Sequence, residues 1–268
     1  MNTSILTQCI FIPAAAAEVF RALTDSTEHS RFTGADSVID PREGGKFSYF
    51  VGLVSGVFEE FVELSRMVQS LHDTEWPEGH NARVEQTLED YLDGKYTRVK
   101  VREVGIPDNH LETVIAGWSD YWSKLAHYLR ERRVAVVNRF VEQYKNQHDW
   151  DCVDEFIATD CKIHIPIPGL PQGREGMRVN GRAVCAAFPD VSVTREFIAT
   201  EGDIVLERAH ANATHEGELL GIPPTGRAVR WSELHAYRVT DGMISEVWSE
   251  PDLMGIMVQI GALDMANP

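Results

Sequence analysis

Cysteine is scarce in this sequence, and long apolar runs are missing from it. Its four cysteines, Cys9, Cys152, Cys161 and Cys185, show no C-x-x-C spacing, so we expect free thiols and no disulfide framework. No stretch approaches the roughly 18 uninterrupted apolar residues that a membrane-spanning helix requires, and the first residues lack a basic segment followed by an apolar core. These absences favour a cytoplasmic protein.

Basic residues are also too few to balance the acidic ones. Lysine and arginine number 25 against 41 aspartates and glutamates, which gives a net charge of −16. Such a chain repels phosphate backbones and anionic lipid, so we expect no nucleic-acid and no membrane partner. A small-molecule partner remains open, and 268 residues with 43% hydrophobic and 25% charged residues suit two globular domains.

Glycine and proline are both missing from Trp118 through Ile165, where a linker would be expected. Flexible linkers are usually rich in glycine and serine, so this absence favours a helix-to-helix joint near Arg130–Arg133. We therefore predict two domains, residues 1–131 and 132–268.

The spacing of apolar residues predicts an α+β domain on each side of this joint. In the first, a strand and a helix precede five or more short antiparallel strands, and a long helix follows at Leu111–Arg130. In the second, helices over residues 134–146, 148–161 and 173–187 accompany long alternating strands. We expect a helix held by a curved sheet in the first domain and a cone of helices and bent sheet in the second.

The strongest local signal is Asp241-Gly242, which lies between two alternating runs. This pair predicts a two-residue type I′ hairpin turn, because that turn needs positive φ at both central positions. In the register that follows, Tyr237 faces Glu246 and His235 faces Trp248. One face of the hairpin then carries five side chains: Glu233, His235, Tyr237, Glu246 and Trp248.

A carboxylate follows this hairpin directly. Pro251 cannot donate to a strand ladder, so the strand ends after Trp248 and Asp252 is expected at the mouth of any cavity that the hairpin face lines. A short helix is predicted next by the spacing of Leu253, Ile256, Met257 and Ile260.

Most of residues 5–130 carries a resemblance to a known superfamily. The segments IPAAAAEVFRALTD, DPREGGKFSYFVGLVSG, EWPEG and AGWSDYWSKL resemble bacterial homologues of the activator of the heat-shock chaperone ATPase, within the helix-grip, START-related superfamily. The resemblance implies a helix-grip fold with an internal apolar cavity, and thus a START-like ligand-binding domain. Trp76, His72 and Trp118 are expected to reach that cavity.

A second resemblance covers roughly Val134–Leu263. THEGELLGIPPTGRAVRW, YRVTDGMISEVW and the Trp248-x-x-x-Asp252 spacing resemble the SnoaL-like polyketide cyclases, of the nuclear-transport-factor-like fold. This resemblance implies a cone-shaped α+β barrel and an intramolecular aldol ring closure that uses no metal or cofactor. Family members often have histidine at this position, and this sequence departs from them by having Tyr237 there.

The resemblance assigns the acid/base role to Asp252, because a carboxylate in an apolar pocket has a raised pKa and both accepts and returns protons well. His235 and Tyr237 are candidate donors to the enolate that forms. The substrate is expected to be a polyketide-like small molecule. Further substrate-binding candidates are Trp248, Glu233, Glu246, His215, Arg208, His164 and Tyr144.

Other interpretations stay open. Asp252 could be no more than the N-cap of the last helix, and the aromatic candidates could belong to the core. The protein could be a non-catalytic binder of apolar molecules, or a hydrolase or dehydratase, because a fold does not fix a function. No metal site is expected, since His210 and His215 lie five apart and on opposite faces of a strand. Curved sheets of this kind often pack face to face, which favours a homodimer.

Overall fold

A computed structural model describes residues 2–263, and the chain divides into two compact units, Met1–Glu131 and Arg132–Pro268. Each unit is an α+β domain with one sheet of its own. The boundary between the units falls inside a single helix, α3 (Leu111–Val141), where the sequence predicted two helices. Within residues 2–263, every helix is too short or too polar to span a lipid bilayer.

The N-terminal unit contains a seven-stranded antiparallel sheet in the order β1-β7-β6-β5-β4-β3-β2. Two helices, α1 (Ala16–Thr24) and α2 (Ser26–Thr33), follow the first strand, and two short 3-10 turns, η1 (Phe50–Gly52) and η2 (Asp108–His110), precede β4 and α3. The strands are β1 (Thr3–Ile12), β2 (Val38–Ile39), β3 (Lys46–Tyr49), β4 (Val54–Val62), β5 (Arg66–Asp73), β6 (Ala82–Tyr91) and β7 (Tyr96–Pro107).

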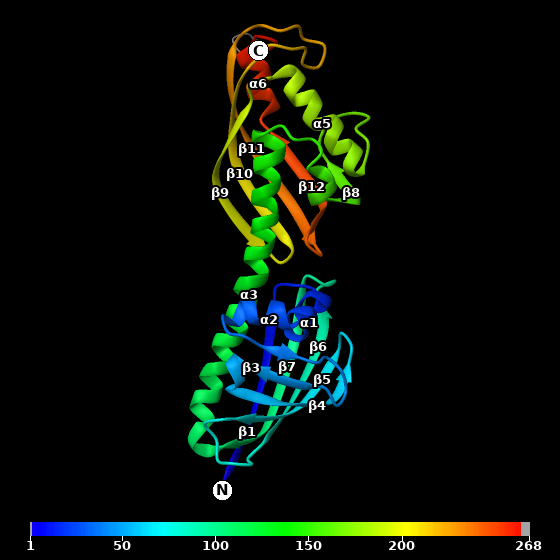
Figure 1. The fold of residues 1–268 in the computed structure, drawn as a ribbon. Coiled ribbons are helices and arrows are strands. Elements are labelled where there is room, and N and C mark those ends of the chain that lie inside the picture. The colour runs from blue at the N-terminus through cyan, green and yellow to red at the C-terminus, as the bar shows by residue number, and fades with distance from the viewer. Residues whose placement is uncertain (1, 264–268) are drawn as a thin grey trace. The chain divides into compact units, whose positions relative to one another are not determined.

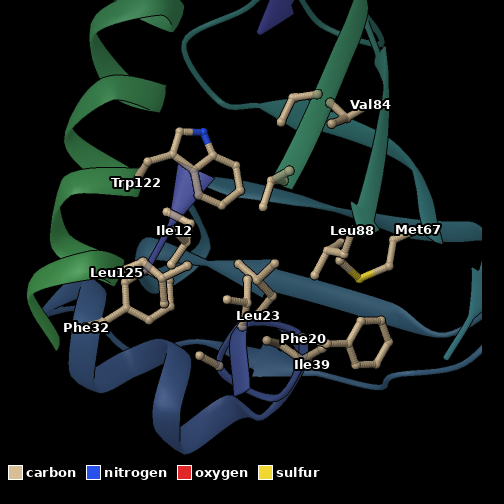
Figure 2. Close-up of a cluster of buried hydrophobic side chains, with 14 of the residues drawn as sticks. Ile12, Phe20, Leu23, Phe32, Ile39, Met67, Val84, Leu88, Trp122 and Leu125 are labelled. Atoms are coloured by element: carbon tan, nitrogen blue, oxygen red, sulfur yellow. The ribbon is translucent and has the colours of Figure 1, made fainter. Parts of the chain in front are cut away.

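The core of this unit lies between the sheet and the first half of α3. Trp122, Leu125 and Leu129 recur at helical spacing and are 4%, 0% and 2% exposed, so one stripe of α3 is removed from water. Phe20 and Leu23 of α1 reach the same cluster, as Figure 2 shows. Each such side chain contributes roughly 1.5–3 kcal/mol on burial. This is the helix-grip arrangement that the sequence predicted.

The C-terminal unit contains a five-stranded sheet in the order β8-β12-β11-β10-β9, in which β8 is the parallel edge strand. The last part of α3 and α5 pack on the same face of this sheet, the inner face (Figure 1). The remaining elements are the π-helical turn η3 (Glu142–Asn146), α4 (Val153–Phe156), β8 (Ile157–His164), α5 (Gly173–Ala187), β9 (Ser192–Glu201), β10 (Ile204–Thr214), β11 (Ala228–Thr240), β12 (Met243–Pro251) and α6 (Leu253–Ile260).

One predicted helix of this unit is wrong. The sequence predicted a helix over residues 148–161, but only α4 is helical there and β8 begins at Ile157. In β8, Ile157, Cys161 and Ile163 are buried, and the strand pairs in parallel with β12. Pairing with β12 therefore makes residues from Ile157 onward a strand, although the helical spacing of apolar residues predicted a helix there.

The hairpin turn is confirmed, because Asp241 and Gly242 both have positive φ, 51° and 78°. The register beyond it is wrong by one residue, since a β-bulge lies between Arg238 and Val239. Tyr237 pairs with Val247, Ala236 with Trp248 and His235 with Ser249, while Arg238 pairs with Glu246.

The bulge has a packing cause. Ile244 and Val247 are three residues apart, and both are buried. Strict alternation would turn one of the two side chains away from the core, and one extra residue, Ser245, lets both point inward. As a consequence Trp248 and Glu246 leave the face that carries His235 and Tyr237.

Candidate functional site

A polar cluster lies on the inner face of the C-terminal sheet, among mostly apolar neighbours. Alternate residues of β11 point to this face, and Glu233, His235 and Tyr237 therefore lie in one row, as predicted. His235 is 6% and Tyr237 1% exposed. Around them pack Val205, Val239 and Val247 of the sheet and Phe140 of α3, so this row is held in a dry environment.

Glu233 is the centre of this cluster. Its Oε2 accepts hydrogen bonds from Lys145 Nζ at 3.0 Å and interacts with His235 Nε2 at 2.6 Å. Its Oε1 accepts from Trp231 Nε1 at 2.8 Å. A second carboxylate, Glu207 of β10, is fully buried and lies 3.8 Å from the same lysine nitrogen.

Glu207 is compensated mainly by an arginine. Arg195 of β9 donates from Nε to Glu207 Oε2 at 2.8 Å, and its Nη2 reaches the same oxygen at 2.5 Å. Buried carboxylates of this kind are costly unless they are paired and hydrogen-bonded. The inner cluster, defined as Lys145, Arg195, Glu207, Glu233 and His235, thus contains two carboxylates, two cations and one imidazole.

The electrostatics of the cluster fix the protonation of Glu233 and His235. Burial raises the pKa of Glu233, but the charge of Lys145 and the hydrogen bond with His235 outweigh it, so that pKa is well below its ordinary value. Burial and the nearby Lys145 charge lower the pKa of His235 more than the two glutamates raise it. At neutral pH we therefore infer a carboxylate next to a neutral imidazole.

The neutral imidazole has one tautomer that fits this contact. A carboxylate can only accept, so Nε2 of His235 carries the proton and donates a hydrogen bond to Glu233 Oε2. Nδ1 then holds a lone pair, and among residues 2–263 it has no hydrogen-bond partner. Tyr237 keeps its proton, because burial and the charges of Glu207 and Glu233 raise its pKa well above the ordinary value.

Asp252 occupies a different setting from the one predicted. It is exposed at the N-cap of α6, and its Oδ1 accepts from Gly255 N at 2.8 Å. Gly255 suits this cap, since a Cβ there would lie 2.3 Å from Asp252 Oδ2. The capping role that the sequence left open is therefore the one seen in the geometry.

Three other predicted site residues lie on the opposite, outer face of the sheet, and for Glu246 and Trp248 this corrects the face that the predicted hairpin register gave them. Trp248 stacks on the ring of His164 with centroids 5.1 Å apart. Glu246 interacts with His164 Nε2 at 2.8 Å and accepts from Arg238 Nε at 3.0 Å. The bulge in the hairpin is the reason, because it reverses the face on which Glu246 and Trp248 emerge.

The remaining substrate-binding candidates, Arg208, Tyr144 and His215, make their hydrogen bonds to residues outside the inner cluster. Arg208 donates to Glu196 Oε2 at 2.7 Å. Tyr144 is a core residue whose hydroxyl donates to the Met177 carbonyl at 2.5 Å. His215 is fully buried in another apolar cluster, where its Nδ1 contacts Thr225 Oγ1 at 3.1 Å.

Three residues of the inner cluster were not predicted from the sequence: Lys145, Glu207 and Arg195. Glu207 carried a usable signal, because it falls between Val205 and Ala209 in an alternating strand whose inward positions are otherwise apolar. Lys145 carried none, since it lies on the π-helical turn η3, where the ordinary helical spacing no longer applies. Among residues 2–263, no three His, Cys, Asp or Glu residues are grouped to hold a metal ion.

Comparison with known proteins divides the chain in the same two parts. Residues 135–260 match the model of the SnoaL-like polyketide cyclase family, and residues 13–130 match that of the Activator of Hsp90 ATPase homolog 1-like proteins. The aklanonic acid methyl ester cyclase DnrD of Streptomyces peucetius is 29% identical over 132 residues, which are 48% of this chain and 90% of that protein.

The human activator of 90 kDa heat shock protein ATPase homolog 1 is 32% identical over 105 residues, which are 39% of this chain and 30% of that protein. The chain spans only 22% to 36% of the length of the curated relatives that its N-terminal half matches. Among solved structures, IdmH from Streptomyces antibioticus, a putative polyketide cyclase, is 34% identical, with a TM-score of 0.44 over 48% of this chain and 98% of that one.

Proposed function

The chain joins an N-terminal domain that resembles Activator of Hsp90 ATPase homolog 1-like proteins to a C-terminal domain that resembles SnoaL-like polyketide cyclases, and on this basis we propose that it is a cyclase-type enzyme. The C-terminal domain closes a ring in a small molecule that has an acidic C–H beside carbonyl groups. Two relatives of the C-terminal domain are named as cyclases of methyl esters, the aklanonic acid methyl ester cyclase of Streptomyces peucetius and the nogalonic acid methyl ester cyclase of Streptomyces nogalater, so the proposed substrate class is a polyketide-like methyl ester.

The observation that carries this proposal is the Glu233–His235 pair. Its buried carboxylate holds the imidazole in one tautomer and leaves Nδ1 as the proton acceptor. In the proposed reaction, Nδ1 of His235 takes the proton from the acidic carbon. The resulting enolate carbon attacks a second carbonyl within the molecule, forming one C–C bond, and the new alkoxide takes the proton back.

The developing negative charge needs donors that are already in place. The Tyr237 hydroxyl stays protonated in this site and is the proposed donor to the enolate oxygen. Lys145 is a positioning residue, because its contact with Glu233 holds that carboxylate ionised next to His235. Every proton that leaves the substrate carbon returns to the product, so the reaction balances without a cofactor.

Asp252 remains a second proposed acid/base residue, supported by the Trp248-x-x-x-Asp252 spacing that led to it. Its exposed position at the start of α6 favours a capping role instead. Asn also caps helices well, so Asp252→Asn removes the base while keeping the cap. Loss of turnover in this variant without loss of stability would assign Asp252 to the chemistry.

The proposal is tested by incubating the whole chain with aklanonic acid methyl ester and related precursors, and following ring closure by chromatography and mass spectrometry. We expect turnover by the wild type and at least a 100-fold loss in His235→Asn, since general base catalysis contributes about 10²–10⁴-fold. His210→Asn is the matched control, because His210 pairs with Glu196 away from the inner cluster. Equal turnover in the wild type and His235→Asn would contradict the assignment of the base.

The second candidate function is non-catalytic binding of an apolar small molecule, which the exposed setting of Asp252 favours. It predicts that precursors are retained on the protein in saturable amounts but recovered unchanged. A hydrolase or dehydratase would instead change the mass of the product by the elements of water or by loss of the ester.

Two general properties also remain proposals. A cytoplasmic location is supported by the free thiols of Cys9, Cys152, Cys161 and Cys185. A homodimer through the C-terminal sheet is supported by analogy with other curved sheets of this kind. Sedimentation of the purified chain tests the second property.

A further inference from the structure

The N-terminal domain contains a partly open cavity of about 500 Å³ between the first half of α3 and the sheet. This volume is typical of small-molecule sites, which occupy roughly 300–1,000 Å³. Its walls include five aromatic side chains, Trp76, Trp118, Tyr49, Phe50 and Tyr121, and the sequence predicted two of them, Trp76 and Trp118, at this cavity. Such walls suit a flat, largely apolar molecule.

A buried carboxylate faces this cavity. Glu103 of β7 is 2% exposed and follows Val99 and Val101 at inward positions of the strand, where an apolar residue would be expected. Its Oε2 accepts a hydrogen bond from Trp118 Nε1 at 2.7 Å. Among residues 2–263 it has no ion pair, and Lys124, the lysine that lines the cavity, is bound to Asp120 at 2.7 Å.

An unused acceptor lies on the neighbouring strand. Gln86 of β6 is 5% exposed and lines the cavity, and its Oε1 has no hydrogen-bond partner in the described part of the chain. Its orientation is fixed on the other side, since Nε2 reaches Gln69 Oε1 at 3.4 Å and Gln69 Nε2 donates to Tyr49 Oη at 2.9 Å. Gln86 pairs with Val101, so it is a diagonal neighbour of Glu103 on the same face.

The charges around the cavity favour a cation. The lining includes four carboxylates, Asp73, Glu75, Glu103 and Asp120, against the single lysine Lys124. Burial and the charge of Asp73 raise the pKa of Glu103, so its ionised form is under-compensated within the protein. A bound positive charge would supply the missing compensation, and aromatic faces also attract cations.

We propose that this cavity binds a small organic cation, an amine on an aromatic or apolar body. The ammonium group donates to Glu103 and to Gln86 Oε1, and the body packs against Trp76 and Trp118. A carboxylate, an unpaired amide oxygen and an aromatic wall together recognise this class of ligand, whereas a neutral apolar molecule would leave Gln86 Oε1 without a partner and the charge of Glu103 without a counter-ion.

The test uses the whole chain, tryptamine as the amine and tryptophol, its neutral alcohol counterpart, in isothermal titration calorimetry. We expect tryptamine to bind at least 10-fold more tightly than tryptophol. In Glu103→Gln, which keeps the size of the side chain and its acceptor for Trp118, this preference should vanish. Glu59→Gln is the matched control, since Glu59 is paired with Arg83 and does not line the cavity, and the preference should persist there.

Three results would overturn the proposal: equal binding of amine and alcohol, binding of neither, or a preference that survives Glu103→Gln. Thermal unfolding checks the premise independently, because removal of an uncompensated buried charge should leave the midpoint unchanged or raise it. A clear drop would mean that Glu103 is already compensated within the fold. If Glu103→Gln does not fold, Gln86→Met provides a second variant, in which tryptamine affinity should fall several-fold.

Discussion

Glu233 uses both of its oxygens inside the C-terminal domain, and three different side chains share them. Lys145 and His235 meet at Oε2, and Trp231 donates to Oε1. A charged group is kept at such a depth only when its partners are in place, because breaking a buried pair costs roughly 3–5 kcal/mol. At the residue scale, the inner cluster therefore contributes to the stability of the domain and is also the proposed site of proton transfer.

A histidine of the N-terminal domain makes stability depend on pH. His29 is fully buried, with Nδ1 2.9 Å from Ser37 Oγ and Nε2 3.0 Å from Tyr121 Oη, and burial lowers its pKa from 6.5 to about 4. Below pH 6.5 the unfolded chain binds the proton and the folded chain does not. The contribution of His29 is thus fully present above pH 6.5 and is lost as the pH falls toward 4.

The expected loss between pH 7 and pH 4 is at most about 3 kcal/mol, measured by chemical unfolding of the whole chain at each pH. His29→Gln, which cannot titrate, should show a shallower pH dependence than the wild type. The same slope in both proteins would show that His29 is already solvated in the folded state.

The cap of α6 gives a second prediction at this scale. Asp252→Ala should lower the free energy of unfolding of the C-terminal domain by about 1 kcal/mol, because Gly255 N loses its acceptor. Asp252→Asn and Asp252→Ser should retain most of the contribution of the cap to the free energy of unfolding. Denaturant titration of the three variants separates this structural role from any effect on turnover.

At the element scale, the bulge in the β11–β12 hairpin decides which side chains share the inner face. Ser245 is the extra residue, so its deletion restores strict alternation while Ile244 and Val247 still point inward. We expect this deletion to cost less than about 1 kcal/mol. Deletion of Ala236 in the partner strand should cost at least about 3 kcal/mol, because it turns buried residues of β11 to the outer face.

Circular dichroism and denaturant titration of the two deletion variants check this prediction. A Ser245 deletion as damaging as the Ala236 deletion would mean that the bulge itself, and not the inward pair, stabilises the hairpin.

Much of the fold could be predicted from local signals, and the bulge shows where such signals end. Asp241-Gly242 sets its own turn through the φ angles that it permits, and the stripe containing Trp122 and Leu125 sets the buried side of α3. The bulge arises because Ile244 and Val247 are three residues apart and both are buried. Strict alternation would expose one of them, so the alternating pattern alone does not predict the extra residue.

Only the part of the candidate site that lies on one strand was predicted from the sequence. Glu233, His235 and Tyr237 follow from alternation within one strand, whereas Lys145 reaches Glu233 from a segment 88 residues away in the chain. Contacts of this kind depend on tertiary packing, and the π-helical turn that presents Lys145 has no marker in the sequence.

At the scale of the whole molecule, each unit has a hydrophobic core of its own. The cluster around Leu125 contains only residues of the N-terminal unit, and the cluster around Ile244 only residues of the C-terminal unit. We therefore expect two calorimetric transitions. Leu125→Ala should destabilise one of them by roughly 2–5 kcal/mol and leave the other in place, and Ile244→Ala should do the reverse. A single transition that both variants shift equally would contradict this expectation.

The central claim is that His235, held by Glu233, removes a proton from a substrate carbon. The most direct measurement is exchange of that carbon-bound hydrogen in D₂O, followed by NMR on aklanonic acid methyl ester with the wild type, His235→Asn and Asp252→Asn. We predict enzyme-dependent exchange with the wild type and Asp252→Asn, and only the background rate with His235→Asn. Exchange by His235→Asn at the rate of the wild type, together with loss of exchange in Asp252→Asn, would contradict the account and make Asp252 the base.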